Sequence, residues 1–226
     1  MFVSPEITGV LSATYIDHMG SDKKIAQAAR TSTKGLDNDR PRVEGLVKAL
    51  WRDQHHGPFE HCALTVALDV PLFVRDQIVR HKSMSFSVMS GRYTEFKPRF
   101  YTPPRDRPLV QTGKALDYRR EPGSDVQQRM TASHHVIAAS EGLNAYRSLL
   151  DTGVANEVAR NVLPASTYTQ MWVTGTLRSW LHFLDQRLDE HAQWEVRQVA
   201  EQVAEIIRHI FPIAYQAWKE KRTAWL

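Results

Sequence analysis

The feature that most constrains the fold is a run of helical sequence that fills the second half of the chain. From Val126 onward, apolar residues recur at helical spacing and helix breakers are few. Pro164 and Pro212 are expected to break or kink the run. The pattern predicts helices at about 126–152, 154–162, 166–188 and 191–219.

The first half of the chain mixes strand and helix patterns. Alternating segments rich in β-formers predict strands, and segments with helical spacing or start signals predict helices. The strands are expected at residues 7–17 and 61–70, and the helices at 22–31, 42–55 and 71–81. Five prolines between residues 97 and 124 predict an irregular excursion instead of a packed element.

Composition indicates one soluble domain that spans residues 1–226. The chain is 42% hydrophobic and 24% charged, which allows a sizeable core, and no composition break suggests a linker. The net charge of +4 is compatible with a nucleotide ligand. Basic and acidic residues are interspersed, so general binding to nucleic acid is not expected. Neither a membrane span nor a signal peptide is expected.

The single cysteine bears on both location and chemistry. One cysteine, Cys62, cannot form an internal disulfide, which predicts a reducing cytoplasm. Cys62 lies in the alternating segment 61–70, so we interpret it as a small core residue instead of a nucleophile.

The segment before that strand contains three histidines and Glu60. A zinc site is conceivable there, but the Gly57-Pro58 turn and the absence of a helical His-x-x-x-His spacing argue against it. No metal site is predicted.

Residues 80–92 form the segment with the most functional information. Arg80, His81, Lys82 and Arg92 surround several serines and Gly91. Guanidinium groups match phosphate oxygens with paired donors, and lysine, hydroxyl and backbone N–H groups complete such a shell. The alternative is a solvated basic turn after a helix. Interleaved apolar residues favour partial burial, and buried cations need anionic partners.

A second cluster lies in residues 177–195. Arg178 and Arg187 are nine residues apart, so on an unbroken helix at about 100° per residue they point to opposite sides. They would then serve different sites or different subunits. The alternative for each arginine is a surface ion pair with Asp185, Asp189 or Glu190.

Together these segments resemble the flavin-dependent thymidylate synthases. Five blocks match that family in order, between about residues 20 and 212. The family's defining motif is Arg-His-Arg followed, after seven residues, by Ser. In this chain it appears as Arg80-His81-Lys82 and Ser90, with Gly91-Arg92-Tyr93 directly after it. The other blocks are Ala29-Arg30-Thr31-Ser32, Pro58-Phe59-Glu60-His61, Ala159-Arg160 to Pro164 with Tyr168-Thr169, and Arg178-Ser179 through Arg187 to His191-Ala192-Gln193-Trp194-Glu195.

The resemblance implies a mixed α/β (α+β) fold, with a central, mostly antiparallel sheet flanked by long helices and a helical C-terminal half. It also implies a homotetramer with active sites shared between subunits. Flavin adenine dinucleotide (FAD) would be held by Ser32, His55, Glu60, Arg80, His81, Lys82, Arg178 and His182. The substrate dUMP would be held by Gln77, Ser90, Gly91, Arg92, Arg160 and Arg187.

The implied reaction converts dUMP to dTMP, with NADPH as reductant and methylenetetrahydrofolate as one-carbon donor. The cofactor carries the redox step, so the protein mainly binds and orients. Arg187 is expected to polarise the pyrimidine ring. Tyr93 resembles the family tyrosine near flavin and substrate. Ser90 could be a nucleophile, but no base lies near it in sequence, which favours a hydrogen-bonding role.

Four departures from the family pattern fall at ligand positions. Lys82 replaces an arginine and loses bidentate geometry. Val88, after Ser87, stands where the family usually has glutamate, and Thr176 and His182 stand where asparagines are common. Two alternatives follow. The first is altered chemistry on the same scaffold, such as pyrimidine hydroxymethylation, and the second is a protein without catalytic activity. The second alternative includes a noncatalytic flavin- or nucleotide-binding paralogue and a basic protein that binds nucleic acid.

Overall fold

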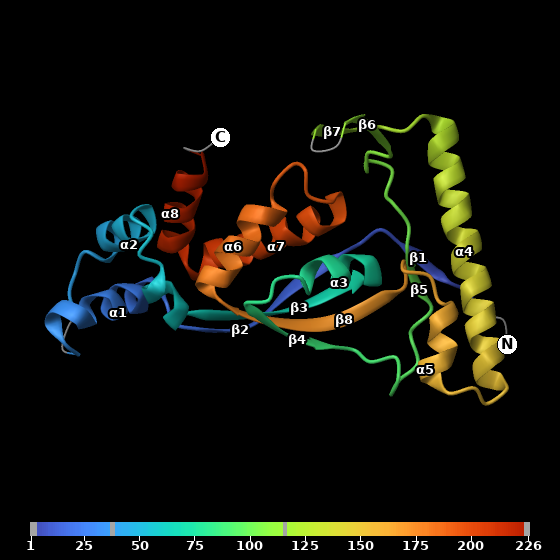
Figure 1. Ribbon diagram of the computed structural model, residues 1–226, viewed down its shortest axis with the longest axis horizontal. Helices are drawn as coiled ribbons and strands as arrows, with labels where there is room; N and C mark the ends of the chain where they lie inside the picture. The colour runs from blue at the N-terminus through green and yellow to red at the C-terminus, as the bar shows by residue number, and fades with distance from the viewer. Residues whose placement is uncertain (1–3, 37–38, 115–116, 224–226) are drawn as a thin grey trace. The chain divides into compact units, whose positions relative to one another are not determined.

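The computed structural model describes residues 4–36, 39–114 and 117–223, and about half of the chain, 51%, is helical (Figure 1). The chain divides into two compact units. The first unit comprises Met1–Ser12, Asp69–Ile78 and Val88–Met171. The second comprises Ala13–Leu68, Val79–Ser87 and Trp172–Leu226. The mixed α/β class with an antiparallel sheet and a helical C-terminal half is confirmed.

The main sheet has four strands in the order β2-β3-β8-β4. Along β3, every second residue is buried, as in Leu64, Val66 and Leu68, and the alternate residues are half-exposed. This alternation identifies one face of the sheet as the core face. The strands are β2 (Ser12–Met19), β3 (Ala63–Pro71), β4 (Met84–Val88) and β8 (Tyr168–Thr176).

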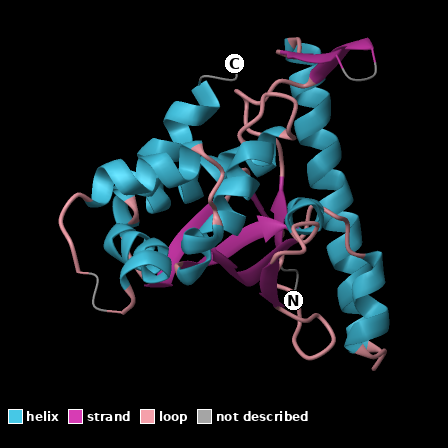
Figure 2. Cartoon of the chain, turned by 60° about the vertical axis from the view of Figure 1, so that its left-hand side comes forward, coloured by secondary structure: helices cyan, strands magenta, loops and turns pink. Residues whose placement is uncertain are grey.

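In the second unit, helices α6 (Leu177–Arg187) and α7 (Trp194–Ile210) lie over the sheet (Figures 1 and 2). Thr176 begins α6, because its side chain accepts the backbone N–H of Ser179 at 3.2 Å. The buried Trp180 of α6 donates its indole N–H to the Leu64 carbonyl of β3 at 2.9 Å. This hydrogen bond and the surrounding apolar packing fix α6, which carries the arginines of interest.

Helices α1 (Asp22–Lys34), α2 (Val43–Arg52) and α8 (Pro212–Thr223) complete the second unit, with the 3-10 turn η1 (Gly57–His61). Asp22 is buried, and its carboxylate accepts the backbone N–H groups of Ile213 and Ala214 at 3.0 and 2.9 Å. It therefore satisfies two of the otherwise unpaired donors at the start of α8. Burial nevertheless raises the pKa of Asp22.

Cys62 is buried beside Gly20, as expected for a core residue. Gly20 has a φ of +94°, and a Cβ there would lie 2.4 Å from the Cys62 sulfur. Burial raises the pKa of the Cys62 thiol, which keeps it protonated. The structure thus gives Cys62 a packing role.

The first unit is built around α4 (Asp125–Asp151), the longest helix among the described residues. Ser124 and Gln127 form a capping box at its start. Its buried residues Ala139, Leu143 and Tyr146 pack with Phe100 and Ala159. The remaining elements are β1 (Glu6–Thr8), α3 (Leu72–Ile78), β5 (Arg99–Tyr101), β6 (Val110–Lys114), β7 (Asp117–Glu121), α5 (Asn156–Ala159) and the 3-10 turn η2 (Arg160–Val162).

Three predictions from the sequence are wrong in part. Residues 97–124 are not simply irregular: β5 pairs in parallel with β1, and β6 and β7 form an antiparallel hairpin. Residues 166–188 are not one helix, because 168–176 form β8, in which buried and exposed residues alternate. The strand predicted at 7–17 is two strands, β1 and β2. The predicted break at Pro212 is confirmed, since α7 ends at Ile210.

Among the described residues, none of the helices combines the length and apolar character that crossing a membrane requires.

Candidate flavin and nucleotide site

The first turns of α6 line a pocket of about 510 Å³ in the second unit. Arg178 and His182 are four residues apart on this helix and therefore share a face. The Arg178 guanidinium forms a 2.5 Å ion pair with Glu60 of η1. Three residues predicted to hold flavin thus come together in one pocket. Its lining residues are Trp51, His56, Glu60, Ser83, Arg178, Ser179, His182 and Asp185.

His56 is a pocket residue that the sequence did not single out. Its ring stacks on Trp51 with centroids 4.2 Å apart, and its Nε2 is buried with no hydrogen-bond partner among the described residues. Burial lowers the pKa of His56, so the ring is neutral at pH 7. An unpaired buried nitrogen in a pocket is a ready partner for a ligand. The neighbouring His55, which was predicted instead, is exposed.

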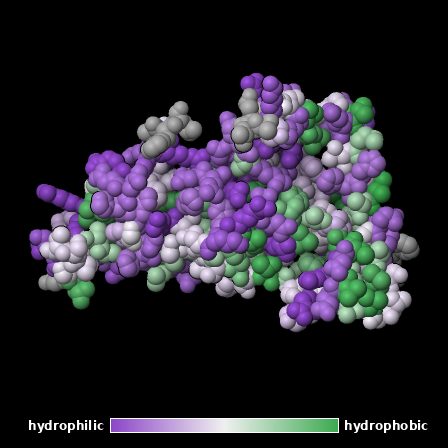
Figure 3. Space-filling model, viewed as in Figure 1, coloured by the Kyte–Doolittle hydropathy of each residue, from purple (hydrophilic) through white to green (hydrophobic). Residues whose placement is uncertain are grey.

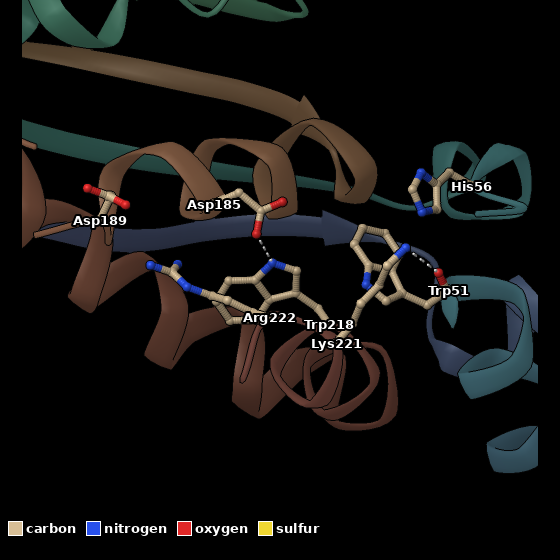
Figure 4. Close-up of a pocket in the computed structure, with 7 residues that line it drawn as sticks. All are labelled: Trp51, His56, Asp185, Asp189, Trp218, Lys221 and Arg222. Carbon is tan, nitrogen blue, oxygen red and sulfur yellow. Dashed lines mark hydrogen bonds between the residues drawn. The ribbon is translucent and has the colours of Figure 1, made fainter. Parts of the chain in front are cut away.

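An adjoining pocket of about 400 Å³ shares Trp51, His56 and Asp185 with the first (Figure 4). Its other polar groups already have partners in the protein. Trp218 donates its indole N–H to Asp185 at 2.7 Å, and Arg222 donates to the Leu184 carbonyl at 2.9 Å. Both tryptophan rings are at least 95% buried, which leaves little ring surface for a ligand. We interpret this region as a packing contact that holds α8 against α6.

Arg187, at the end of α6, contacts the basic segment. Its Nε donates a hydrogen bond to Nε2 of His81 at 2.9 Å. His81 lies in the turn between α3 and β4, is 7% exposed, and packs edge-on against Phe183 of α6. Burial, with further contributions from Arg187 and His182, lowers the pKa of His81 to about 4. The imidazole is therefore neutral at pH 7 and its Nε2 can accept.

The Arg187 side chain is half-buried and stays charged. Burial, with a smaller effect of nearby Arg80, lowers the pKa of its guanidinium. The ordinary pKa of an arginine side chain is so high that the group is still a cation at neutral pH. A partly desolvated cation interacts more strongly with an anion than an exposed one does. Arg187 is therefore a partly desolvated cation, and its role toward the pyrimidine ring stays a prediction.

The other predicted flavin residues, Ser32, Arg80 and Lys82, lie outside the lining of the α6 pocket. Arg80 and Lys82 are exposed on either side of His81. Ser32 is exposed on α1, where its hydroxyl donates to the Ala29 carbonyl at 3.3 Å. Their role toward flavin stays a prediction.

The predicted nucleotide residues Gln77, Ser90, Gly91, Arg92 and Arg160 lie in the first unit, whereas Arg187 lies in the second. The Ser90 hydroxyl accepts the Arg92 backbone N–H at 3.3 Å, which shapes the turn that Gly91 permits. A Cβ at Gly91 would lie 2.2 Å from the Phe96 ring, so this glycine is required for packing within the protein.

Two side chains in that turn are open to solvent. Arg92 forms a 2.9 Å ion pair with Glu157, and both side chains are about half-exposed. Tyr93 is 81% exposed, and the Arg92 guanidinium lies over its ring at 5.6 Å. A ligand anion could replace Glu157 at little cost, because an exposed pair of this kind contributes only about 0–1 kcal/mol.

The departures from the family pattern have structural counterparts. Thr176 caps α6, which asparagine also does well. His182 lines the α6 pocket and forms a 3.0 Å hydrogen bond with Gln186. Val88 ends β4 and is half-buried.

The donor set of the α6 pocket fits a flavin nucleotide. Arg178, His182 and Ser83 offer N–H and O–H donors of the kind that bind phosphate and ring carbonyl oxygens, and His56 adds a nitrogen that has no hydrogen-bond partner among the described residues. The half-buried ring of His56, which stacks on the buried Trp51, adds apolar surface to the lining.

Comparison with known proteins identifies the family. Residues 14–213 match the family described as thymidylate synthase complementing protein. The flavin-dependent thymidylate synthase of Streptomyces avermitilis is 33% identical over 96% of this chain and 94% of its own length. That of Thermotoga neapolitana is 37% identical over 90% and 88%. The crystal structure of the UMP/dUMP methylase PolB from Streptomyces cacaoi with 5-Br UMP superposes with a TM-score of 0.91 at 33% identity, covering 96% of this chain and 97% of PolB.

The fold and the matched relatives define an enzyme of the methyltransferase class. The chain belongs to the flavin-dependent thymidylate synthase family. The resemblance inferred from five short sequence blocks is thereby confirmed. The roles of individual residues remain predictions.

Proposed function

We propose that this chain converts dUMP to dTMP. The observation that carries the proposal is the match to flavin-dependent thymidylate synthases along residues 14–213, which includes the segment 80–92 and all of α6. The α6 pocket and the half-buried Arg187 support it, because they supply a flavin-type donor set and a cation held by a hydrogen bond within that matched region.

In the proposed reaction FAD supplies the redox chemistry, NADPH supplies the electrons and methylenetetrahydrofolate supplies the carbon. We assign flavin binding in the α6 pocket to four of its lining residues: His56, Glu60, Arg178 and His182. Ser32, His55, Arg80 and Lys82 are further candidates. Because the cofactor carries the redox step, the protein is required mainly to bind and orient the reactants.

The protein's own contribution is electrostatic. Arg92 and Arg160 offer guanidinium donors to the nucleotide phosphate, with Ser90 and Gln77 as hydrogen-bonding partners. Arg187 stabilises negative charge that develops on the pyrimidine ring during attack at C5, and its partial burial strengthens that effect. Buried, protonated Cys62 has no part in the chemistry.

The range of pyrimidine nucleotides deserves a direct test. PolB, which superposes with a TM-score of 0.91, is a UMP/dUMP methylase, and this observation favours UMP as a second substrate. Hydroxymethylation and a noncatalytic role are not favoured by the comparisons, since the relatives are thymidylate synthases and a methylase.

We also propose that the two compact units act as one catalytic domain in a cytoplasmic homotetramer. Exposed apolar side chains recur on α4, and Figure 3 shows apolar residues on the visible face there. Trp172 on β8 is also 54% exposed. Exposed apolar surface of this kind is typical of surfaces that another protein covers. The exposed α4 side chains are Val126, Met130, Val136 and Ile137.

Two measurements test the proposal. Absorbance of the purified protein in the flavin bands reports cofactor binding, and a product assay with FAD, NADPH and methylenetetrahydrofolate compares dUMP with UMP. We expect dTMP from dUMP. Release of the C5 proton without a methylated product would favour altered chemistry instead, and a protein that takes up no flavin would overturn the proposal.

A further inference from the structure

The contact between His81 and Arg187 has features that a simple flavin-binding role for His81 does not require. The imidazole is 7% exposed, so most of its surface meets protein. Its Nε2 faces the Arg187 Nε at 2.9 Å, and its ring edge packs on Phe183 with centroids 4.9 Å apart. Phe183 and Arg187 are four residues apart and share one face of α6.

We propose that His81 is a positioning residue that acts on the reaction through Arg187, as the neutral acceptor that fixes the orientation of its guanidinium. This inference rests on the proposed function, because it assigns His81 a part in the same reaction. Long arginine side chains lose much rotamer freedom when they are held in place. A hydrogen bond to Nε restrains the plane of the guanidinium before substrate arrives, which is the kind of preorganisation that electrostatic catalysis needs.

The surroundings of His81 keep it an acceptor. The arginine Nε always carries a hydrogen, so Nε2 of His81 has to be unprotonated, and the single ring proton is then on Nδ1. The titratable groups that act on the ring are Arg187 and His182 of α6, and both disfavour a second positive charge. Arg80, from the segment of His81 itself, adds positive charge near Arg187. A protonated His81 would lose the hydrogen bond and repel Arg187.

The location of His81 also explains why the motif places it between two cations. Residues 81–84 form a turn closed by a 3.1 Å hydrogen bond from the Met84 N–H to the His81 carbonyl. This turn directs the imidazole inward while Arg80 and Lys82 stay exposed. The central residue of Arg80-His81-Lys82 therefore contacts the protein interior, and its neighbours remain available to an anionic ligand.

The first experiment uses side-chain replacements in the FAD-loaded enzyme. His81→Phe keeps a ring against Phe183 but removes the acceptor, and His81→Gln restores an acceptor oxygen near the position of Nε2. We expect kcat to fall about 10- to 100-fold in His81→Phe, with little change in the KM for dUMP or in flavin content, and to recover substantially in His81→Gln. His209→Phe, on the exposed side of α7, is the matched control and should behave as wild type.

A double-mutant cycle separates positioning from a general structural effect. In an Arg187→Lys background the Nε donor is absent, so His81→Phe should lower kcat by no more than about two- to threefold further. Equal losses in both backgrounds would overturn the proposal. A loss confined to flavin content would also overturn it, because His81 would then act on the cofactor.

A measurement that needs no activity keeps this inference separate from the proposed function. NMR of protein with ¹⁵N-labelled histidine rings, assigned by the missing signal in His81→Gln, reports the tautomer directly. We expect His81 to be neutral with Nδ1 protonated from pH 8 to pH 5, and Arg187→Leu to shift its Nε2 resonance. A protonated or Nε2–H ring would overturn the inference even if dTMP is formed. The expected tautomer in a protein that forms no dTMP would refute the proposed function alone.

Discussion

The two ends of segment 80–92 differ in how the protein holds their charges. At His81 the ring is buried, and its Nε2 accepts a hydrogen bond from the Arg187 Nε of α6. At Arg92 the guanidinium is about half-exposed and pairs with a half-exposed carboxylate, Glu157. Buried groups are held in one geometry before a ligand binds, whereas exposed pairs exchange partners readily. The same short segment thus combines a prearranged end with an adaptable one.

This difference predicts separate kinetic roles for the two arginines. A prearranged cation can act on charge that appears only in the transition state, and so affects kcat. An adaptable cation can capture a charged group that is present from the start, and so affects binding. The predictions below test this contrast in order of expected effect.

The largest effect is expected for Arg187→Ala. Removal of a fixed charge at the reacting ring should lower kcat about 100- to 1000-fold, with the fold retained. Steady-state kinetics with dUMP measure it, and circular dichroism with a flavin titration checks folding and cofactor binding. Turnover within threefold of wild type would remove Arg187 from the reaction.

Arg92→Ala should act mainly on binding. Loss of a charge-assisted hydrogen bond to phosphate is expected to raise the KM for dUMP about 10- to 100-fold, with a much smaller change in kcat. Deoxyuridine, which lacks the phosphate, provides the control: its weak binding should be the same in wild type and variant. A fall in kcat as large as that of Arg187→Ala would erase the distinction between the two ends.

Local sequence patterns predicted the family and several helices, but they did not predict contacts that depend on the folded chain. The order of charged, small and aromatic residues identified the family. A helix start signal located α1, helical spacing located α2 and α4, and Pro212 located the break before α8. The Arg187–His81 hydrogen bond joins residues more than one hundred positions apart, so no local pattern contains it. His56 was missed for a different reason: it is only five residues from Trp51, but its stacking on that ring depends on the conformation of the turn between them. Strand β8 was mistaken for helix because Val173 and Met171 fit either period in isolation.

The pH dependence of stability should distinguish the buried histidine from an exposed one. The folded pKa of His81, about 4, lies below the ordinary value of 6.5. Its contribution to stability is therefore complete above pH 6.5 and is lost as the pH falls toward 4. Between pH 7 and pH 5 the loss is about 2 kcal/mol. In His81→Gln, the free energy of unfolding measured with urea should therefore fall by about 2 kcal/mol less than in wild type between pH 7 and pH 5.

His209→Gln is the matched control for this measurement. His209 is exposed on α7, and its ring lies 3.4 Å from Glu205. Its replacement should leave the slope of stability against pH close to that of wild type. Identical slopes for His81→Gln and wild type would show that His81 is not held neutral by burial.

The smallest effect is expected at the other end, for Glu157→Gln. The Arg92–Glu157 pair is about half-exposed on both sides, so its loss should change the free energy of unfolding by less than about 1 kcal/mol. Under the proposed assignment of Arg92 to the substrate phosphate, Glu157 competes with that phosphate, so the same change should lower the KM for dUMP slightly and leave kcat as it is. Arg92→Ala in the Glu157→Gln background is the control, because it should abolish the gain. A raised KM in Glu157→Gln would mean that the carboxylate orients Arg92 for the nucleotide, and the adaptable end of the segment would then be prearranged as well.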